Sequence, residues 1–203
     1  NSLSGTIDTT NISASLGNIS NVSGSLTFGN SSGNEVIQNI ARIDVNQNSS
    51  NSSINATISE AENIGVSIGF GTLEGNVRQN IANLSSNNLS NSNINVNLSD
   101  AINASGSVLA NSDANQNIAS IDAAGDVDGL DIDLTLGTVT NTGFDVLASS
   151  SLSQDLGSIS SEGNVENTKI SGNLDNVSNA SYGALANVNS EQIVASIKSG
   201  NIS

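Results

Sequence analysis

The sequence predicts an all-β fold, a parallel β-solenoid of five stacked rungs. Three observations predict it: one short motif recurs five times at a nearly fixed spacing, apolar residues alternate with a period of two, and the 203 residues contain no proline. Fixed spacing on this scale is typical of stacked repeats. Proline is excluded from the middle of sheets because it lacks the N–H that a strand ladder needs.

The recurring motif is a glutamine followed by aliphatic and small residues, and Gln116–Ile121 is its clearest copy. The five copies begin at Gln38, Gln79, Gln116, Gln154 and Gln192. Successive glutamines are 41, 37, 38 and 38 residues apart. The motif therefore predicts one side of a rung of about 38–42 residues.

Alignment outward from the motif divides the chain, taken as a single domain over 1–203, into repeat units. The units cover approximately 5–46, 47–86, 87–124, 125–162 and 163–199, with 200–203 starting a sixth rung. Within a unit Ile132, Leu134 and Leu136 alternate with polar residues, which is a strand pattern. We expect three or four short strands per rung, joined by Asn, Ser, Gly and Asp turns. Apolar columns one strand spacing apart would form the core of such a stack.

The composition excludes several classes of function. The formal net charge is −15, so nucleic acid is not an expected partner. Histidine and cysteine are absent, and the bases left for a serine nucleophile are distant carboxylates, Lys169 and Lys198, so we expect no enzyme activity, no metal and no cofactor. No apolar run of membrane-spanning length occurs, so membrane insertion is not expected. The high Asn and Ser content raises disorder as an alternative, against which the regular apolar positions argue.

Two columns of amide side chains are the candidate structural sites. In a stack of equivalent strands, the five motif glutamines would lie above one another and hydrogen-bond as a ladder that sets the register. The alternative is a polar residue beside a turn, with no ladder. A second column consists of Asn21, Asn63, Asn103, Asn141 and Asn179. For these asparagines a left-handed corner is the alternative role.

An acidic run occurs at only one place in the chain and is not repeated from rung to rung. Its members are Asp122, Asp126, Asp128, Asp131 and Asp133. Carboxylates suit Ca²⁺, but their order does not match a calcium-binding loop, so a solvated acidic face is the favoured interpretation.

The two ends of the sequence resemble each other, Ser4-Gly5-Thr6-Ile7 at the start and Ser199-Gly200-Asn201-Ile202 at the end. Neither looks like a cap, and an uncapped solenoid exposes strand edges. We therefore expect head-to-tail stacking of copies, a contact that does not close and yields a filament. The expected polymerisation ends are Gly5, Thr6, Ile7, Gly200, Asn201 and Ile202. The alternative is a piece of a longer repeat array.

A resemblance adds to this interpretation. Asn103-Ala104-Ser105-Gly106, followed by Asn115-Gln116-Asn117-Ile118-Ala119, resembles the repeats of the Fap functional-amyloid subunits of bacterial biofilms. The sequence departs from that family because its units abut without long linkers and a doubled glutamine is missing. Curli-type subunits are similar in their Gln and Asn ladders, but their rungs are about half as long.

The resemblance implies a secreted subunit that polymerises as stacked β-rungs in an extracellular matrix. The expected function is thus structural: a subunit of an extracellular filament, at the cell surface or in a biofilm matrix, with its signal peptide removed. Its expected partner is itself, with other matrix components as further candidates. The alternative is a β-helical stalk or recognition module of an adhesin or phage fibre, in which the turns Gly29–Ile37 and Gly71–Arg78 contact a ligand.

Overall fold

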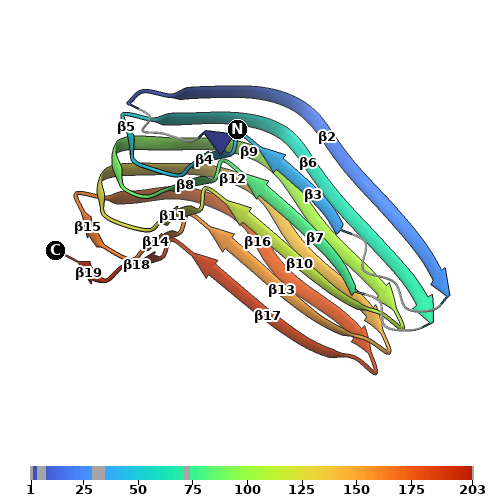
Figure 1. Ribbon diagram of the computed structural model, residues 1–203. Helices are drawn as coiled ribbons and strands as arrows, with labels where there is room; N and C mark the ends of the chain where they lie inside the picture. Colours follow the sequence, from blue (N-terminus) through green and yellow to red (C-terminus); the bar gives the residue numbers. More distant parts are fainter. Residues whose placement is uncertain (1, 4–7, 29–34, 71–73, 203) are drawn as a thin grey trace.

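The computed structural model describes residues 2–3, 8–28, 35–70 and 74–202, which form an all-β parallel solenoid of about five turns (Figure 1). Every pairing between strands is parallel, and each strand lies beside its equivalent in the next repeat unit. The fold class expected from the sequence is confirmed.

Three sheets run along the solenoid. The long-strand sheet contains β2 (Asn11–Phe28), β6 (Ser53–Phe70), β9 (Leu89–Val108), β12 (Val127–Val146) and β16 (Lys169–Ala184), with the short pieces β5 (Ser49–Ser50), β15 (Asn164–Glu166) and β19 (Asn201–Ile202). The return sheet contains β3 (Glu35–Ile40), β7 (Glu74–Ile81), β10 (Asn111–Ile118), β13 (Ser149–Leu156) and β17 (Asn187–Val194). The short-strand sheet contains β1 (Ser2–Leu3), β4 (Ile43–Val45), β8 (Leu84–Ser86), β11 (Ile121–Ala123), β14 (Ile159–Ser161) and β18 (Ile197–Lys198).

Each rung passes once through all three sheets. The first rung is β2–β3–β4, and the fifth is β15–β16–β17–β18. Figure 1 shows the long strands running to one end of the molecule, where the chain turns back into the return sheet. The rungs contain three or four strands, as expected, but the long strands reach 20 residues and are not short.

The long strands continue through a change in which face they bury. In β9 the buried positions are Ile94, Val96 and Leu98, and then Ala101 and Asn103, because two consecutive residues there are exposed. In the first rung the same three-residue step separates Leu16 from Ile19, which are the equivalents of Leu98 and Ala101. The parallel ladder persists across this step, so the position that resembles a turn in sequence lies within one strand.

Left-handed backbone makes the corners of the rungs. The corner between the return and short-strand sheets has positive φ in every rung, at Ala41, Ala82, Ala119, Gly157 and Ala195. A second corner has positive φ at Asn51, Asn91, Gly129 and Asn167, just before β6 and β16 and within the first residues of β9 and β12. Asn and Gly are the residues that adopt this conformation most readily, which explains their choice at the second corner.

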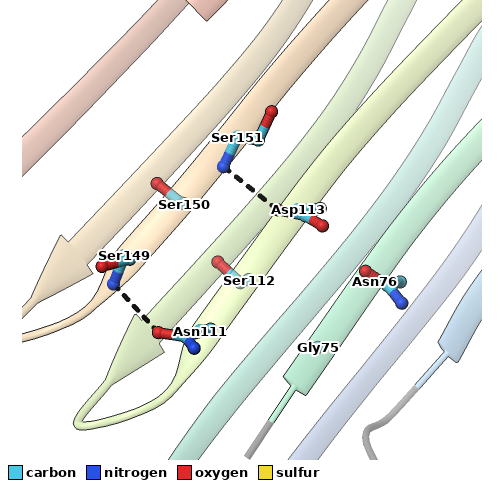
Figure 2. A pocket seen from close by; sticks show the side chains of 8 residues that line it. All are labelled: Gly75, Asn76, Asn111, Ser112, Asp113, Ser149, Ser150 and Ser151. Atoms are coloured by element: carbon cyan, nitrogen blue, oxygen red, sulfur yellow. Dashed lines mark hydrogen bonds between the residues drawn. The ribbon is translucent and has the colours of Figure 1, made fainter. Parts of the chain in front are cut away.

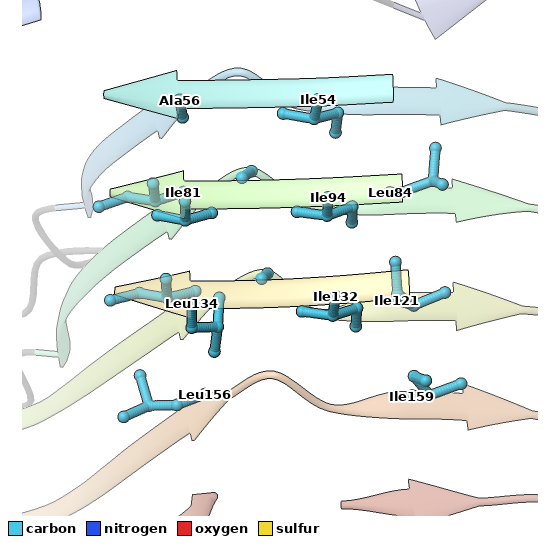
Figure 3. Close-up of a cluster of buried hydrophobic side chains, with 14 of the residues drawn as sticks. Ile54, Ala56, Ile81, Leu84, Ile94, Ile121, Ile132, Leu134, Leu156 and Ile159 are labelled. Atoms are coloured by element: carbon cyan, nitrogen blue, oxygen red, sulfur yellow. The ribbon is translucent and has the colours of Figure 1, made fainter. Parts of the chain in front are cut away.

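The core lies between the long-strand sheet and the other two sheets as stacked columns of aliphatic side chains. Figure 3 shows one such column, Ile54, Ile94 and Ile132, each about 1% exposed. In Figure 3 Ile81 and Leu156 lie on one side of this column, beside Ala56 and Leu134, and Leu84, Ile121 and Ile159 lie on its other side. Burying one large aliphatic side chain is worth about 1.5–3 kcal/mol, so repeated columns stabilise a thin coil that has few aromatic residues.

Candidate functional site

The five motif glutamines form a hydrogen-bonded column inside the solenoid. Gln79 Nε2 donates to Gln38 Oε1 at 2.8 Å, and Gln116 Nε2 donates to Gln79 Oε1 at 2.8 Å. The column continues through Gln154 to Gln192, with one donor per step. Gln79, Gln116 and Gln154 are completely buried. The strand register places each glutamine directly opposite the next, as the sequence spacing predicted.

The five asparagines of the second column also form a ladder. Asn63 Nδ2 donates to Asn103 Oδ1 at 3.0 Å, and Asn103 Nδ2 donates to Asn141 Oδ1 at 2.9 Å. Asn21 and Asn179 extend the ladder at its two ends. All five lie within long strands and none has a positive φ, so the alternative role at a left-handed corner is wrong.

The two columns point in opposite directions. Each glutamine donates to the rung before it, whereas each asparagine donates to the rung after it. Backbone carbonyls fix these orientations: Asn141 Nδ2 also donates to Ser153 O at 3.0 Å, and Gln154 Nε2 also donates to Ser178 O at 3.2 Å. An amide turned the other way would place two oxygens against each other at those points. The polarity of each column is therefore set by the surrounding backbone.

At each end of the solenoid the amide columns present unused atoms of matching kinds. On the first rung these are Asn21 Oδ1 and the second N–H of Gln38 Nε2. On the fifth rung they are Gln192 Oε1 and the second N–H of Asn179 Nδ2. In the glutamine column the first rung thus offers a donor and the fifth rung an acceptor. In the asparagine column the first rung offers an acceptor and the fifth rung a donor.

The apolar columns are also left half-covered at both ends. Ile12 and Ile19 on the first rung, and Leu174 and Val177 on the fifth, are only partly buried against the core. Leu16 is 37% exposed, although its equivalents in the second and third rungs are about 1% exposed. The end rungs carry core residues without the neighbouring rung that would cover them.

A third amide column was missed by the sequence analysis. Asn80 Nδ2 donates to Asn39 Oδ1 at 2.8 Å, and Asn117 Nδ2 donates to Asn80 Oδ1 at 3.0 Å on the outer side of the return sheet. Asp155 is the next member of this column. Burial raises the pKa of Asp155 above its ordinary value, the Ser158 hydroxyl lowers it, and the charge of Glu191 raises it further. Asp155 Oδ1 is buried without a hydrogen-bond partner.

A buried carboxylate was also missed. Asp145 is completely buried, and it accepts hydrogen bonds from the hydroxyls of Ser107, Ser112 and Ser150. It stands in a column that holds serine in the three preceding rungs, at positions 25, 67 and 107. The signal in the sequence was an acid at a position otherwise occupied by small residues.

The acidic run does not converge. Asp122, Asp126, Asp128, Asp131 and Asp133 are all exposed, and they lie in β11, in β12 and in the turn between these strands. Within the described part of the chain, no group of three or more acidic, His or Cys side chains is placed to hold a metal ion. Asp131 and Asp133 face outward from the long-strand sheet, as a solvated face requires.

Several expected contact segments fall outside the described residues. Gly5, Thr6 and Ile7 are not described, and neither are residues 29–34 and 71–73 of the two longer turns. Asn201 and Ile202 form β19, which pairs with β15, and Gly200 N donates to Gly163 O at 3.1 Å. The described residues include no helix of the length and apolarity needed to cross a membrane.

A shallow hollow of about 380 Å³ lies on the return sheet, where its strands begin after the turn from the long strands (Figure 2). Two of its side chains already bind the next rung: Asn111 Oδ1 accepts from Ser149 N, and Asp113 Oδ1 accepts from Ser151 N. Its polar groups therefore pair rungs, as the amide columns do. The arginines lie elsewhere, Arg42 beside Asp44 and Arg78 at 3.7 Å from Glu35.

Fold and site together define a β-solenoid repeat protein with interior amide ladders and two complementary ends. No family model, no curated protein and no solved structure matches the chain.

Proposed function

We propose that the chain is the structural subunit of an extracellular filament that grows by head-to-tail stacking of solenoids. The observation that carries the proposal is the match between the ends of the two amide columns. Placing the first rung of one copy on the fifth rung of another brings Gln38 Nε2 to Gln192 Oε1, and Asn179 Nδ2 to Asn21 Oδ1. Both columns then continue across the junction with their own polarity.

The same placement also covers the apolar side chains that are left half-exposed on the two end rungs. The strand register makes Ile12 equivalent to Ile170, Leu16 to Leu174 and Ile19 to Val177. Stacking therefore puts each half-covered core residue against its equivalent, at about one strand spacing of 4.8 Å. The opposite arrangement, with two fifth rungs facing, reverses the strands of one copy, so neither the parallel ladders nor the apolar columns continue across the junction. The head-to-tail contact does not close on itself and extends without limit.

The chain segments at the junction must also be rearranged. The short-strand sheet has six strands, whereas the return sheet has five. When β2 and β3 of an added copy sit on β16 and β17, its β1 reaches the level that β18 already occupies. One of these two segments must therefore leave the sheet before the long strands meet.

The extracellular part of the proposal rests on the resemblance to functional-amyloid repeats and on the composition. A formal net charge of −15 keeps single copies apart before assembly, and a chain without cysteine stacks without disulfide exchange. A biofilm matrix or cell surface is the proposed location. Immunogold labelling of intact source cells tests it, and label confined to the cell interior overturns it.

A cross-linking experiment tests the head-to-tail contact. Ser15 and Asn173 are exposed equivalents on the first and fifth rungs, and the chain has no cysteine of its own. Within one copy they lie four rungs apart, about 19 Å, but across the proposed junction they are one strand spacing apart. A short bis-maleimide should link Ser15→Cys chains to Asn173→Cys chains, and neither variant to itself.

Negative-stain microscopy of the unmodified chain provides the direct observation. Filaments of uniform width support the proposal. A chain that stays monomeric at high concentration, with no mixed cross-link, overturns it and supports a stalk or recognition module instead.

A further inference from the structure

The outer side of the long-strand sheet changes character along the strands. Toward the end where the chain turns back, its outward side chains are apolar, and we call this surface the wide-end apolar face. Its exposed large members are Val22, Leu26, Phe28, Val66, Ile68, Phe144 and Tyr182, with Val108 and Val146 partly buried beside them. Phe144 and Tyr182 are each 60% exposed. An apolar surface of this kind on a soluble chain indicates a contact with another molecule.

The face has a hollow at its centre. It measures about 280 Å³ and is lined by Val66, Gly106 and Phe144, among others. Gly106 forms its floor because it lacks a side chain. A Cβ there would lie 3.7 Å from the Phe144 carbonyl oxygen and 3.8 Å from Val66 Cγ2, so the neighbours leave room for one.

Large and small residues are arranged so that the face complements itself. The central column reads Gly24, Val66, Gly106, Phe144 and Tyr182 from the first rung to the fifth. A half-turn about an axis along the strands, midway between the third and fourth rungs, exchanges those two rungs. Phe144 of each copy then lies opposite the hollow at Gly106 of the other.

The flanking columns follow the same rule. The half-turn also exchanges the second and fifth rungs, which sets Ile64 opposite Ala180 and Ile68 opposite Ala184. Each of the three neighbouring columns thus contains one large residue opposite a small one, while Val66 faces Tyr182 and Val108 faces Val146 in an apolar contact. A two-fold contact requires this kind of self-complementary surface.

Charge also favours a second copy at this surface. The outward positions of the face hold no Asp, Glu, Lys or Arg, whereas the other half of the same sheet exposes Asp131 and Asp133. Asp145, the acid within this stretch, points inward and is buried. Two molecules of charge −15 can approach most closely where each is uncharged.

We propose that the wide-end apolar face pairs with the same face of a second copy running in the opposite direction, with Phe144 seated in the Gly106 hollow of its partner. The contact is lateral, so it is separate from head-to-tail stacking and compatible with it. Together they give filaments that associate as antiparallel pairs. The lateral contact also forms between single copies.

Cross-linking tests the lateral contact independently of filament growth. Ala104 and Thr142 lie opposite each other across the proposed pair, about 10 Å apart for packed sheets, but at least four rungs apart, about 19 Å, in a head-to-tail stack. A short bis-maleimide should link Ala104→Cys chains to Thr142→Cys chains. Adding Gly106→Leu to both should abolish the product, because the leucine fills the hollow.

Gly17→Leu is the matched control, since a Cβ at Gly17 meets nothing within 4 Å and the position lies outside the face. It should leave the cross-link unchanged. A cross-link that persists in the Gly106→Leu background, or is absent from the parent pair, overturns the proposal.

A membrane surface is the other candidate occupant of the face, and flotation with neutral phosphatidylcholine vesicles tests it. If the parent chain floats but gives no cross-link, and the Gly106→Leu variant does not float, then the face binds a membrane. That result also overturns the proposal. Loss of filaments with retention of the cross-link leaves the lateral contact standing.

Discussion

Gln154 Nε2 lies 2.7 Å from Gln116 Oε1, and the two side chains are completely buried one rung apart. The bond is one step of a column whose direction opposes that of the asparagine column beside it. A rung that slips by one residue would move its amide to the other face of the sheet. The columns therefore fix the register of the rungs and also hydrogen-bond each rung to the next.

Replacing Gln116 should test the interior contribution. Gln116→Ala leaves Gln79 Oε1 and Gln154 Nε2 without their partner inside the core. We expect a loss of about 2–4 kcal/mol in the free energy of unfolding, measured by chemical denaturation. Asn97→Ala, on the exposed side of β9, should change it by less than about 0.5 kcal/mol.

Assembly should depend on the whole glutamine column. Replacing Gln38, Gln79, Gln116, Gln154 and Gln192 together by alanine removes both the interior ladder and the two atoms offered at the ends. We expect slower elongation in a seeded assay followed by light scattering. Elongation at the parent rate would contradict a role for the column in adding subunits.

Sequence reasoning located the two main amide columns because their members are spaced like the rungs. Gln79 and Gln116 stand out within regular apolar alternation, so their register follows once the repeat length is known. The column through Asn39, Asn80 and Asn117 did not stand out, because asparagine is frequent throughout the chain and Asp155 interrupts it.

Long strands and corners were harder to predict for a physical reason. The change of buried face after Leu98 breaks the period of two, and a break in period resembles a turn unless the neighbouring rung is known to continue the ladder. Ala119 has a positive φ of 55°, a conformation that alanine rarely adopts in isolation. Stacking of identical corners imposes it, and no local preference of the sequence encodes it.

Asp155→Asn should stabilise the protein at neutral pH. The amide introduced by this substitution would extend the Asn80–Asn117 ladder, and the substitution removes a carboxylate whose pKa is raised by burial and by Glu191. Because the folded-state pKa lies above the ordinary 3.8, the charged group lowers stability in full above the folded-state pKa. That loss disappears as the pH falls below 3.8.

The expected gain is about 1 kcal/mol at pH ~7, or roughly 2–4 °C in Tm, and smaller at pH ~3. Thermal denaturation at both pH values measures it. Asp131→Asn removes the same charge from an exposed position and should shift Tm by less at pH ~7. Equal shifts for the two variants would show that net charge alone is responsible.

Leu147 lies at a third left-handed corner, between the long strand β12 and the return strand β13, and offers a test of these corners. It is 52% exposed and has a φ of 53°, so its side chain adds backbone strain of about 1–2 kcal/mol and buries little. Leu147→Gly should relieve that strain at an entropic cost of about 0.4–1 kcal/mol and raise Tm. Leu26→Gly, at an exposed strand position without positive φ, should lower Tm; a lower Tm for both variants would refute the strain argument.

Removing residues 1–7 should speed filament formation. Ser2 in β1 pairs with Asp44, and the register through the short-strand sheet makes Ser2 equivalent to Lys198 in β18. In a head-to-tail stack, β1 of an added copy would therefore occupy the same place as β18 of the copy beneath. Deletion removes that competition while leaving β2, β3 and both amide columns in place. We expect a shorter lag in unseeded assembly and an unchanged free energy of unfolding to within about 1 kcal/mol, since β1 contributes only two paired residues.

Deletion of 199–203, which leaves β18 in place, is the control and should shorten the lag less. A longer lag after deletion of 1–7 would mean that β1 takes part in the junction and does not obstruct it.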